Sequence, residues 1–106
     1  MTFMISQPMI GKTDEEIFKK RESITKQLES KGHTVADTYI HADPPSDVKH
    51  IGLWYLAKSI EAMSKVDAVY FAENWFDYRG CSCEQICATA YDLQIEIENL
   101  IVETTE

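Results

Sequence analysis

The chain has 106 residues, of which 44% are apolar, and a formal net charge of -8. This length and composition predict one globular domain over residues 1–106, and the acidic charge argues against binding to a nucleic-acid backbone, which needs a basic stripe. A small anionic ligand remains compatible with the charge, because a few backbone N–H groups at a helix start can hold a phosphate.

The first segment, residues 2–6 (TFMIS), is a short apolar run of strand length that Gln7 and Pro8 bring to an end. A helix is predicted to follow between Thr13 and Gly32, since Thr13 and a glutamate three residues later have the spacing of a capping box. The apolar residues of this helix recur on one face: Ile17, Ile24 and Leu28.

The middle of the chain repeats this alternation. Residues 34–40 (TVADTYI) alternate in polarity and predict a second strand, and residues 41–50 form a loop broken by two prolines. Residues 52–65 have helical spacing, and residues 66–72 (VDAVYFA) predict a buried strand before a loop at 73–78. The helix is expected to bring four apolar residues to one side: Leu53, Leu56, Ile60 and Met63.

A helix over 80–92 and a strand over 94–103 complete the pattern. Strands that alternate with helices predict an α/β fold, here a three-layer flavodoxin- or Rossmann-like domain with a mainly parallel sheet of four to five strands and helices on both faces. In such sheets ligands bind at the carboxyl ends of the strands. The segments expected to form a site are therefore 7–13, 41–51 and 73–84.

Glu84 stands out at the start of the last helix. Ser82 and Gln85 have capping-box spacing just after Gly80, which predicts that Glu84 lies in the first helical turn. A glutamate there can simply complement the helix dipole. Alternatively, a carboxylate that the dipole keeps ionised at the strand-end rim is a nucleophile or an anchor for a ligand hydroxyl. The pattern alone leaves both interpretations open.

Three cysteines lie in the same helix. Cys83 and Cys87 are four residues apart, which favours a role as small apolar groups on a buried face, whereas Cys81 could be a thiolate nucleophile because helix starts lower thiol pKa values. No histidine lies near Cys81 in sequence, so Glu84 ranks above it. The spacing does not match a zinc site, and we predict no metal and no cofactor. An odd number of cysteines favours reduced thiols and a cytoplasmic location.

Aromatic residues are frequent just before Gly80. Trp75 and Tyr78 are placed where they could stack on a planar ring, and Asp77 and Arg79 alternate with them. This arrangement suits a ligand that carries both a base and a phosphate or carboxylate.

Three stretches lie between residues 3 and 91 and so span most of the chain: FMISQPMIGKTDEE, LWYLAKSIEAMSKVDAVYFAENW and RGCSCEQICATAY. They resemble small bacterial and phage domains related to nucleoside 2-deoxyribosyltransferases. The resemblance implies that Glu84, in a Gly-x-x-x-Glu-x-x-x-Ala motif, attacks C1' of a 2'-deoxyribosyl group and expels the base. A carboxylate is the usual partner for an oxocarbenium-like centre, and a second acid commonly protonates the leaving group.

The chain departs from the family pattern at two positions. The aspartate expected two residues before Gly80 is replaced by Tyr78, with Asp77 one residue further back as the candidate acid, and Met4 replaces a tyrosine of the first strand. Glu84 and Asp77 are thus the predicted catalytic residues. The predicted substrate-binding residues are Ser6, Gln7, Pro8, Gly11, Lys12, Trp75, Tyr78, Arg79, Gly80, Cys81 and Ser82.

Three functions fit these features. The first is an N-glycosidic transferase or hydrolase for a 2'-deoxynucleoside or its 5'-monophosphate. The second is a protein that binds a nucleotide or a nucleotide-like signal without cleaving it, and the third is an interaction module. The predicted partner is a small molecule rather than a nucleic-acid polymer or a membrane. A homodimer or higher even assembly is expected because the domain is small and rich in aromatic residues.

Overall fold

The structure, a computed structural model, describes residues 1–98. Eight elements follow one another along the chain: β1 (Thr2–Ser6), α1 (Asp14–Ser30), β2 (Thr34–Val35), α2 (Ile51–Met63), β3 (Ala68–Phe71), the short 3₁₀ helix η1 (Trp75–Asp77), α3 (Arg79–Ala90) and β4 (Gln94–Ile97). The strand predicted over 94–103 begins where expected, and its residues 99–103 lie outside the described part of the chain.

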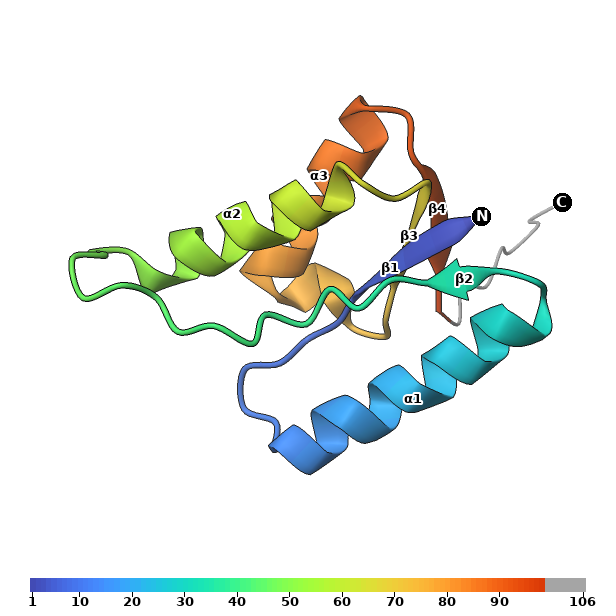
Figure 1. The fold of residues 1–106 in the computed structure, drawn as a ribbon, viewed down its shortest axis with the longest axis horizontal. Helices are drawn as coiled ribbons and strands as arrows, with labels where there is room; N and C mark the ends of the chain where they lie inside the picture. Colours follow the sequence, from blue (N-terminus) through green and yellow to red (C-terminus); the bar gives the residue numbers. More distant parts are fainter. Residues whose placement is uncertain (99–106) are drawn as a thin grey trace, which may run out of the picture.

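The four strands form one parallel sheet in the order β2-β1-β3-β4. Helix α1 covers one face of the sheet, and α2 and α3 cover the other, as Figure 1 shows. The predicted three-layer α/β fold with a parallel sheet is therefore confirmed. β1 and β3 are neighbours in the sheet, but α1 leaves β1 on one face and α3 leaves β3 on the other. Such a reversal opens a crevice at the carboxyl ends of the two strands.

Alternation along β1 and β3 divides the core into two halves. Phe3, Ile5 and Tyr70 face α1, where they pack with Ile24 and Leu28. The strand residues that alternate with them face α2 and α3: Met4, Val69 and Phe71. There they pack with Met63 of α2 and Ala88 of α3. Since successive strand residues point to opposite faces, the parity of a residue in β1 decides which half of the molecule it serves.

The start of α1 has the predicted capping box. Thr13 Oγ1 accepts a hydrogen bond from the Glu16 N–H at 3.1 Å, and Glu16 Oε1 accepts one from the Thr13 N–H at 3.1 Å. Gly32 follows the end of the helix with a φ of +88°, a left-handed conformation that glycine adopts without strain. The three apolar residues predicted on one face, Ile17, Ile24 and Leu28, are buried.

The second strand is shorter than predicted. It contains Thr34 and Val35 rather than residues 34–40, and the Ala36 N–H makes the last backbone hydrogen bond to β1, to Phe3 O at 2.9 Å. Asp37 Oδ1 then accepts the Tyr39 N–H at 3.2 Å. An aspartate that bonds the backbone two residues ahead favours a turn over an extended strand. This turn takes Tyr39 out of the sheet.

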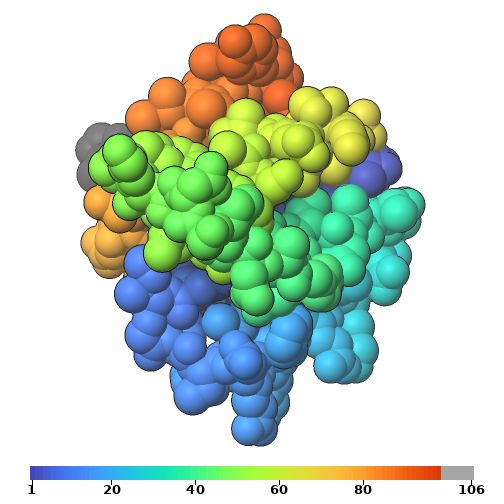
Figure 2. Space-filling model, turned by 60° about the vertical axis from the view of Figure 1, so that its left-hand side comes forward, coloured from blue at the N-terminus to red at the C-terminus, as the bar shows by residue number. Residues whose placement is uncertain are grey.

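Helix α2 lies close to its predicted range, but its packing differs from the prediction. Met63 is buried against the sheet, whereas Leu53, expected on the packed side, is 61% exposed. The reason is the position of the helix: its second half covers the sheet, and its first half extends past the strand ends with the loop at 41–50 (Figure 1). Figure 2 shows the molecule from this side, with the loop and the start of α2 in front. No helix within residues 1–98 is long and apolar enough to cross a membrane.

Candidate active site

Glu84 lies in the second turn of α3, not in the first turn. The helix begins at Arg79 because η1 leads straight into it, with the Ser82 N–H bonded to Tyr78 O at 3.0 Å. The predicted capping box is also wrong: Ser82 Oγ donates to Phe76 O at 3.3 Å, and Gln85 Nε2 donates to Thr89 Oγ1 at 3.0 Å. Glu84 therefore does not act as a first-turn partner of the helix dipole.

The Glu84 side chain is directed inward at the carboxyl end of β1. It is 7% exposed, and its Oε1 accepts a hydrogen bond from Ser6 Oγ at 3.0 Å. The Ser59 hydroxyl of α2 lies near the carboxyl group and favours its ionised form. The structure thus brings together Glu84 and Ser6, two predicted site residues that are 78 positions apart in the sequence.

Burial controls the charge of this carboxyl group. Loss of solvent raises the pKa of Glu84 to about 7, although the hydroxyls of Ser6 and Ser59 and the positive charge of Arg21 favour the ionised form. The helix dipole falls off beyond the first turn, so it does not offset the burial as the sequence interpretation expected. Near neutral pH the group therefore exists in both protonation states.

Cys81 lies beside the same pair of residues. It is 4% exposed, and burial raises its pKa to about 11, a change that the hydroxyl of Ser6 opposes and the charge of Glu84 reinforces. Its sulfur is thus a neutral thiol near pH 7, which argues against a thiolate nucleophile. Cys83 is half-buried, and Cys87 packs at the edge of the core on the α3 side.

Asp77 does not join the Glu84 cluster, which consists of Glu84 and the four residues that affect its carboxyl group or lie beside it: Ser6, Arg21, Ser59 and Cys81. It lies in η1 with an exposed side chain, and within residues 1–98 that side chain makes no hydrogen bond or ion pair. Trp75 is half-buried, with its ring centroid 5.3 Å from that of Phe71, so its ring already packs on the core. Tyr78 is half-buried at the N-cap of α3 and supplies no side-chain cap.

Arg79 reaches the start of α2. A Cβ atom built on Gly52 would lie 3.5 Å from Arg79 Nη2, and His50, the N-cap of α2, makes no side-chain capping hydrogen bond. A guanidinium group and the unbonded N–H groups of a first helical turn thus lie close together, an arrangement suited to an anion. The neighbouring Gly80 is exposed, and a Cβ atom added to it would meet no other part of the described chain within 4 Å.

The remaining predicted residues lie on the other face of the sheet. Gln7 points toward α1, where its Nε2 donates to Ile17 O at 3.1 Å. Gln7, Pro8 and Lys12 line a cleft of about 230 Å³ between the β1–α1 loop and the end of β3. Gly11, in the same loop, has a φ of +80°. The predicted binding residues are therefore divided between two places.

Two residues of the Glu84 cluster were not predicted from the sequence, namely Ser59 and Arg21. Arg21 is half-buried on α1, with its guanidinium carbon 6.0 Å from the centroid of the Tyr39 ring. The spacing offers a signal for it, because Arg21 lies four residues after Ile17 and three before Ile24, on the buried stripe. Ser59 has a comparable spacing, three residues after Leu56 and four before Met63, but its effect on Glu84 depends on how α2 packs.

Within residues 1–98, no group of three or more His, Cys, Asp or Glu side chains is placed to hold a metal ion. Comparison of the chain with protein-family models, with curated proteins and with solved structures finds no match. The function of the protein is therefore inferred from the geometry of the chain itself and from the motifs in its sequence.

Proposed function

We propose that this protein cleaves or transfers the N-glycosidic bond of a 2'-deoxynucleoside or its 5'-monophosphate, with Glu84 as the nucleophile. The observation that carries the proposal is the buried Glu84 carboxyl group at the carboxyl end of β1, held by Ser6 Oγ at 3.0 Å. Ligands of open α/β sheets bind at this edge, and a positioned carboxylate is the usual nucleophile toward a glycosidic carbon. The sequence resemblance to nucleoside 2-deoxyribosyltransferases supports the same role.

The proposed reaction has two steps. In the first, an ionised Glu84 oxygen bonds to C1', the bond from C1' to the base nitrogen breaks, and the base leaves with the electron pair and takes up a proton. In the second, water or an acceptor base attacks C1', and Glu84 leaves as a carboxylate. The hydrogen bond from Ser6 orients the carboxyl group for both steps. Asp77 is the candidate proton donor, and it would have to turn inward from its exposed position in η1.

Arg79 suggests that a 5'-monophosphate is the better substrate. Its guanidinium lies against the start of α2, where backbone N–H groups are also unbonded. A phosphate there would gain a charge-assisted hydrogen bond that an uncharged 5'-hydroxyl cannot match. The overall acidity of the chain does not prevent this, because a local cluster of donors acts at short range.

A second function is favoured by two specific observations. Asp77 is exposed, and the pKa of Glu84 is raised to about 7, so the cluster holds a partly protonated carboxyl group to which no second acid among residues 1–98 is hydrogen-bonded. Such a site suits a protein that binds a nucleotide or nucleotide signal without cleaving it.

Under either function, the cytoplasmic location and the homodimeric or higher even assembly remain predictions from the sequence.

The experiment is an incubation of the protein with 2'-deoxynucleosides and their 5'-monophosphates, with and without a second free base, followed by chromatography of the released base. Base release that is lost in Glu84→Gln supports the nucleophile. Arg79→Ala is expected to weaken activity on monophosphates about ten-fold or more and to leave nucleosides unaffected. If no substrate releases base, the enzymatic function is wrong, and thermal stabilisation by the same compounds then tests the binding function.

A further inference from the structure

The cleft on the α1 face is a second place where a small molecule can bind. It has a volume of about 230 Å³ and lies where the β1–α1 loop meets the end of β3. Its walls come from three segments, the loop after β1, the first turns of α1 and the residues after β3: Gln7, Pro8, Lys12, Glu16, Lys20, Ala72, Glu73 and Asn74. Because β1 and β3 send their helices to opposite faces, this is the crevice that the topology predicts.

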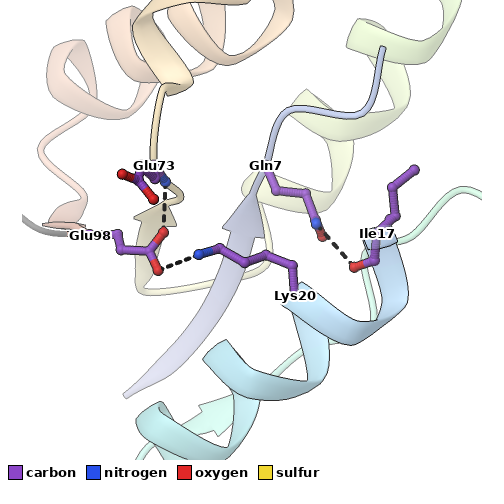
Figure 3. A network of polar contacts seen from close by, with 5 residues as sticks. All are labelled: Gln7, Ile17, Lys20, Glu73 and Glu98. Atoms are coloured by element: carbon purple, nitrogen blue, oxygen red, sulfur yellow. Dashed lines mark hydrogen bonds and ion pairs between the residues drawn. The ribbon is translucent and has the colours of Figure 1, made fainter. Parts of the chain in front are cut away.

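This cleft is separate from the Glu84 cluster. Ser6 and Gln7 are successive residues of one extended chain, so their side chains leave β1 in opposite directions. Ser6 donates a hydrogen bond to Glu84 of α3. Gln7 instead bonds Ile17 of α1, as Figure 3 shows. None of Ser6, Ser59, Cys81 and Glu84 lines the cleft. A ligand in the cleft would therefore not need the carboxyl group of Glu84.

Gln7 supplies an unsatisfied hydrogen-bond acceptor. The residue is 6% exposed, and its Nε2 must be the atom that meets the Ile17 carbonyl, since only a donor can satisfy a carbonyl oxygen. Its Oε1 is buried and has no donor among residues 1–98. A buried acceptor without a donor carries a cost in stability. An N–H or O–H group that reaches the inner wall of the cleft would remove this cost.

Two charged side chains that line the cleft have no ion-pair partner among residues 1–98. Lys20 Nζ pairs with Glu98 Oε2 at 2.6 Å, and Glu98 Oε1 also accepts the Glu73 N–H at 2.8 Å, a network visible in Figure 3. Glu16 is engaged by Thr13 in the capping box. Within the described chain, the side chains of Lys12 and Glu73 have no ion-pair partner. The wall formed by the β1–α1 loop thus carries the ammonium group of Lys12, and the wall formed after β3 carries the carboxylate of Glu73.

We propose that this cleft binds a small zwitterion of the free α-amino acid class. The carboxylate of the ligand would pair with Lys12, and its ammonium group would donate to Gln7 Oε1 and pair with Glu73. Inorganic phosphate fits less well, because it brings little donor capacity to Gln7 and is repelled by Glu73. A neutral pentose could donate to Gln7 but would leave both charges without a partner.

The test is a titration of the ¹⁵N-labelled full chain, followed by NMR, with a panel of free L-amino acids, inorganic phosphate and 2-deoxyribose. We expect saturable shifts from at least one amino acid, including a shift of the Gln7 side-chain amide. Lys12→Ala and Glu73→Gln should each raise the Kd about ten-fold or more, since each removes a charged contact. Lys19→Ala and Glu61→Gln are matched surface controls that should leave the Kd unchanged.

The outcomes are distinct from those of the proposed enzymatic function. Glu84→Gln should retain amino-acid binding even though it loses base release. The proposal is overturned if no amino acid shifts the Gln7 amide, if phosphate or 2-deoxyribose binds instead, or if Lys12→Ala and Glu73→Gln bind as tightly as the wild type.

Discussion

Glu84 is a carboxyl group whose burial works against the stability of the folded protein at high pH. Its pKa rises from 4.5 to about 7 on folding, so the folded state binds more protons than the unfolded state between these values. By linkage, Glu84 makes its full contribution to the stability of the folded state below about pH 4.5, where it is protonated in both states. This contribution is lost as pH rises through 7. The side chain is retained at a cost, which is typical of a residue kept for its chemistry rather than for the fold.

The Glu84→Gln variant tests this cost directly. Glutamine fills the same space without a charge, so the variant should gain stability relative to the wild type as pH increases, by up to about 3 kcal/mol well above pH 7. Urea unfolding at pH 5 and pH 9 measures the difference. An equal offset between the two proteins at both pH values would show that the pKa of Glu84 is not raised.

Ser6→Ala is expected to move the pH dependence of the proposed reaction. The Ser6 hydroxyl favours the ionised carboxylate, so its loss should raise the pKa of Glu84 further. Because the nucleophile must be ionised, the activity should increase with pH through a midpoint near 7 in the wild type and through a higher midpoint in Ser6→Ala. A pH–rate profile for base release measures both. An unchanged midpoint with a lower plateau would mean that Ser6 only positions the carboxyl group.

At the scale of elements, the start of α1 supports both the fold and the cleft. The Thr13 capping box fixes the first turn, which carries Glu16 at the cleft wall. Thr13→Ala should lower the free energy of unfolding by about 1 kcal/mol, because it leaves a helix-start N–H without its acceptor. Ser23→Ala, at an exposed position in the middle of α1, is the control and should be neutral or slightly stabilising. Equal effects of the two substitutions in urea unfolding would contradict the role of the cap.

The elements that the sequence predicts well are those whose signals are local. The β1 strand ends at Ser6 as expected because Gln7 and Pro8 follow it, and α1 starts after its own capping residue, Thr13. The errors arise where a nearby interaction competes with the pattern. Asp37 turns the chain out of β2, and η1 starts α3 earlier than the Ser82 motif suggests.

The site was predictable in part for the same reason. Glu84 and Ser6 each lie in a local pattern, a helix motif and a strand end, and the parallel topology brings both to one edge of the sheet. Whether Gln7 shares that site depends on the side of the strand from which it leaves. Parity along β1 answers this question once the face of one residue is known. Helical spacing places Arg21 and Ser59 on the packed side of their helices, but their approach to Glu84 depends on how the helices pack, which no local pattern encodes.

At the scale of the whole molecule, the ion pair between Lys20 and Glu98 joins parts that are distant in the chain. Lys20 belongs to α1, Glu98 follows β4, and Glu98 also holds the backbone of Glu73 after β3 (Figure 3). One carboxylate thus links the helix layer on the α1 face to the ends of two strands. The exposed pair of Lys26 and Glu22, at 3.0 Å within α1, links nothing beyond its own helix.

Double-mutant cycles on these two pairs distinguish an ion pair that connects separate elements from an ion pair on the surface of one helix. Replacing Lys20 and Glu98 by alanine, singly and together, should give a coupling of about 1 kcal/mol in urea unfolding, since Glu98 is largely buried and also bonds a backbone N–H. The same cycle on Lys26 and Glu22 should give a coupling of about 0.5 kcal/mol or less that falls as salt is added. If the two couplings are equal, Glu98 does not hold the strand ends to α1, and the wall of the cleft is fixed by the strand backbones alone.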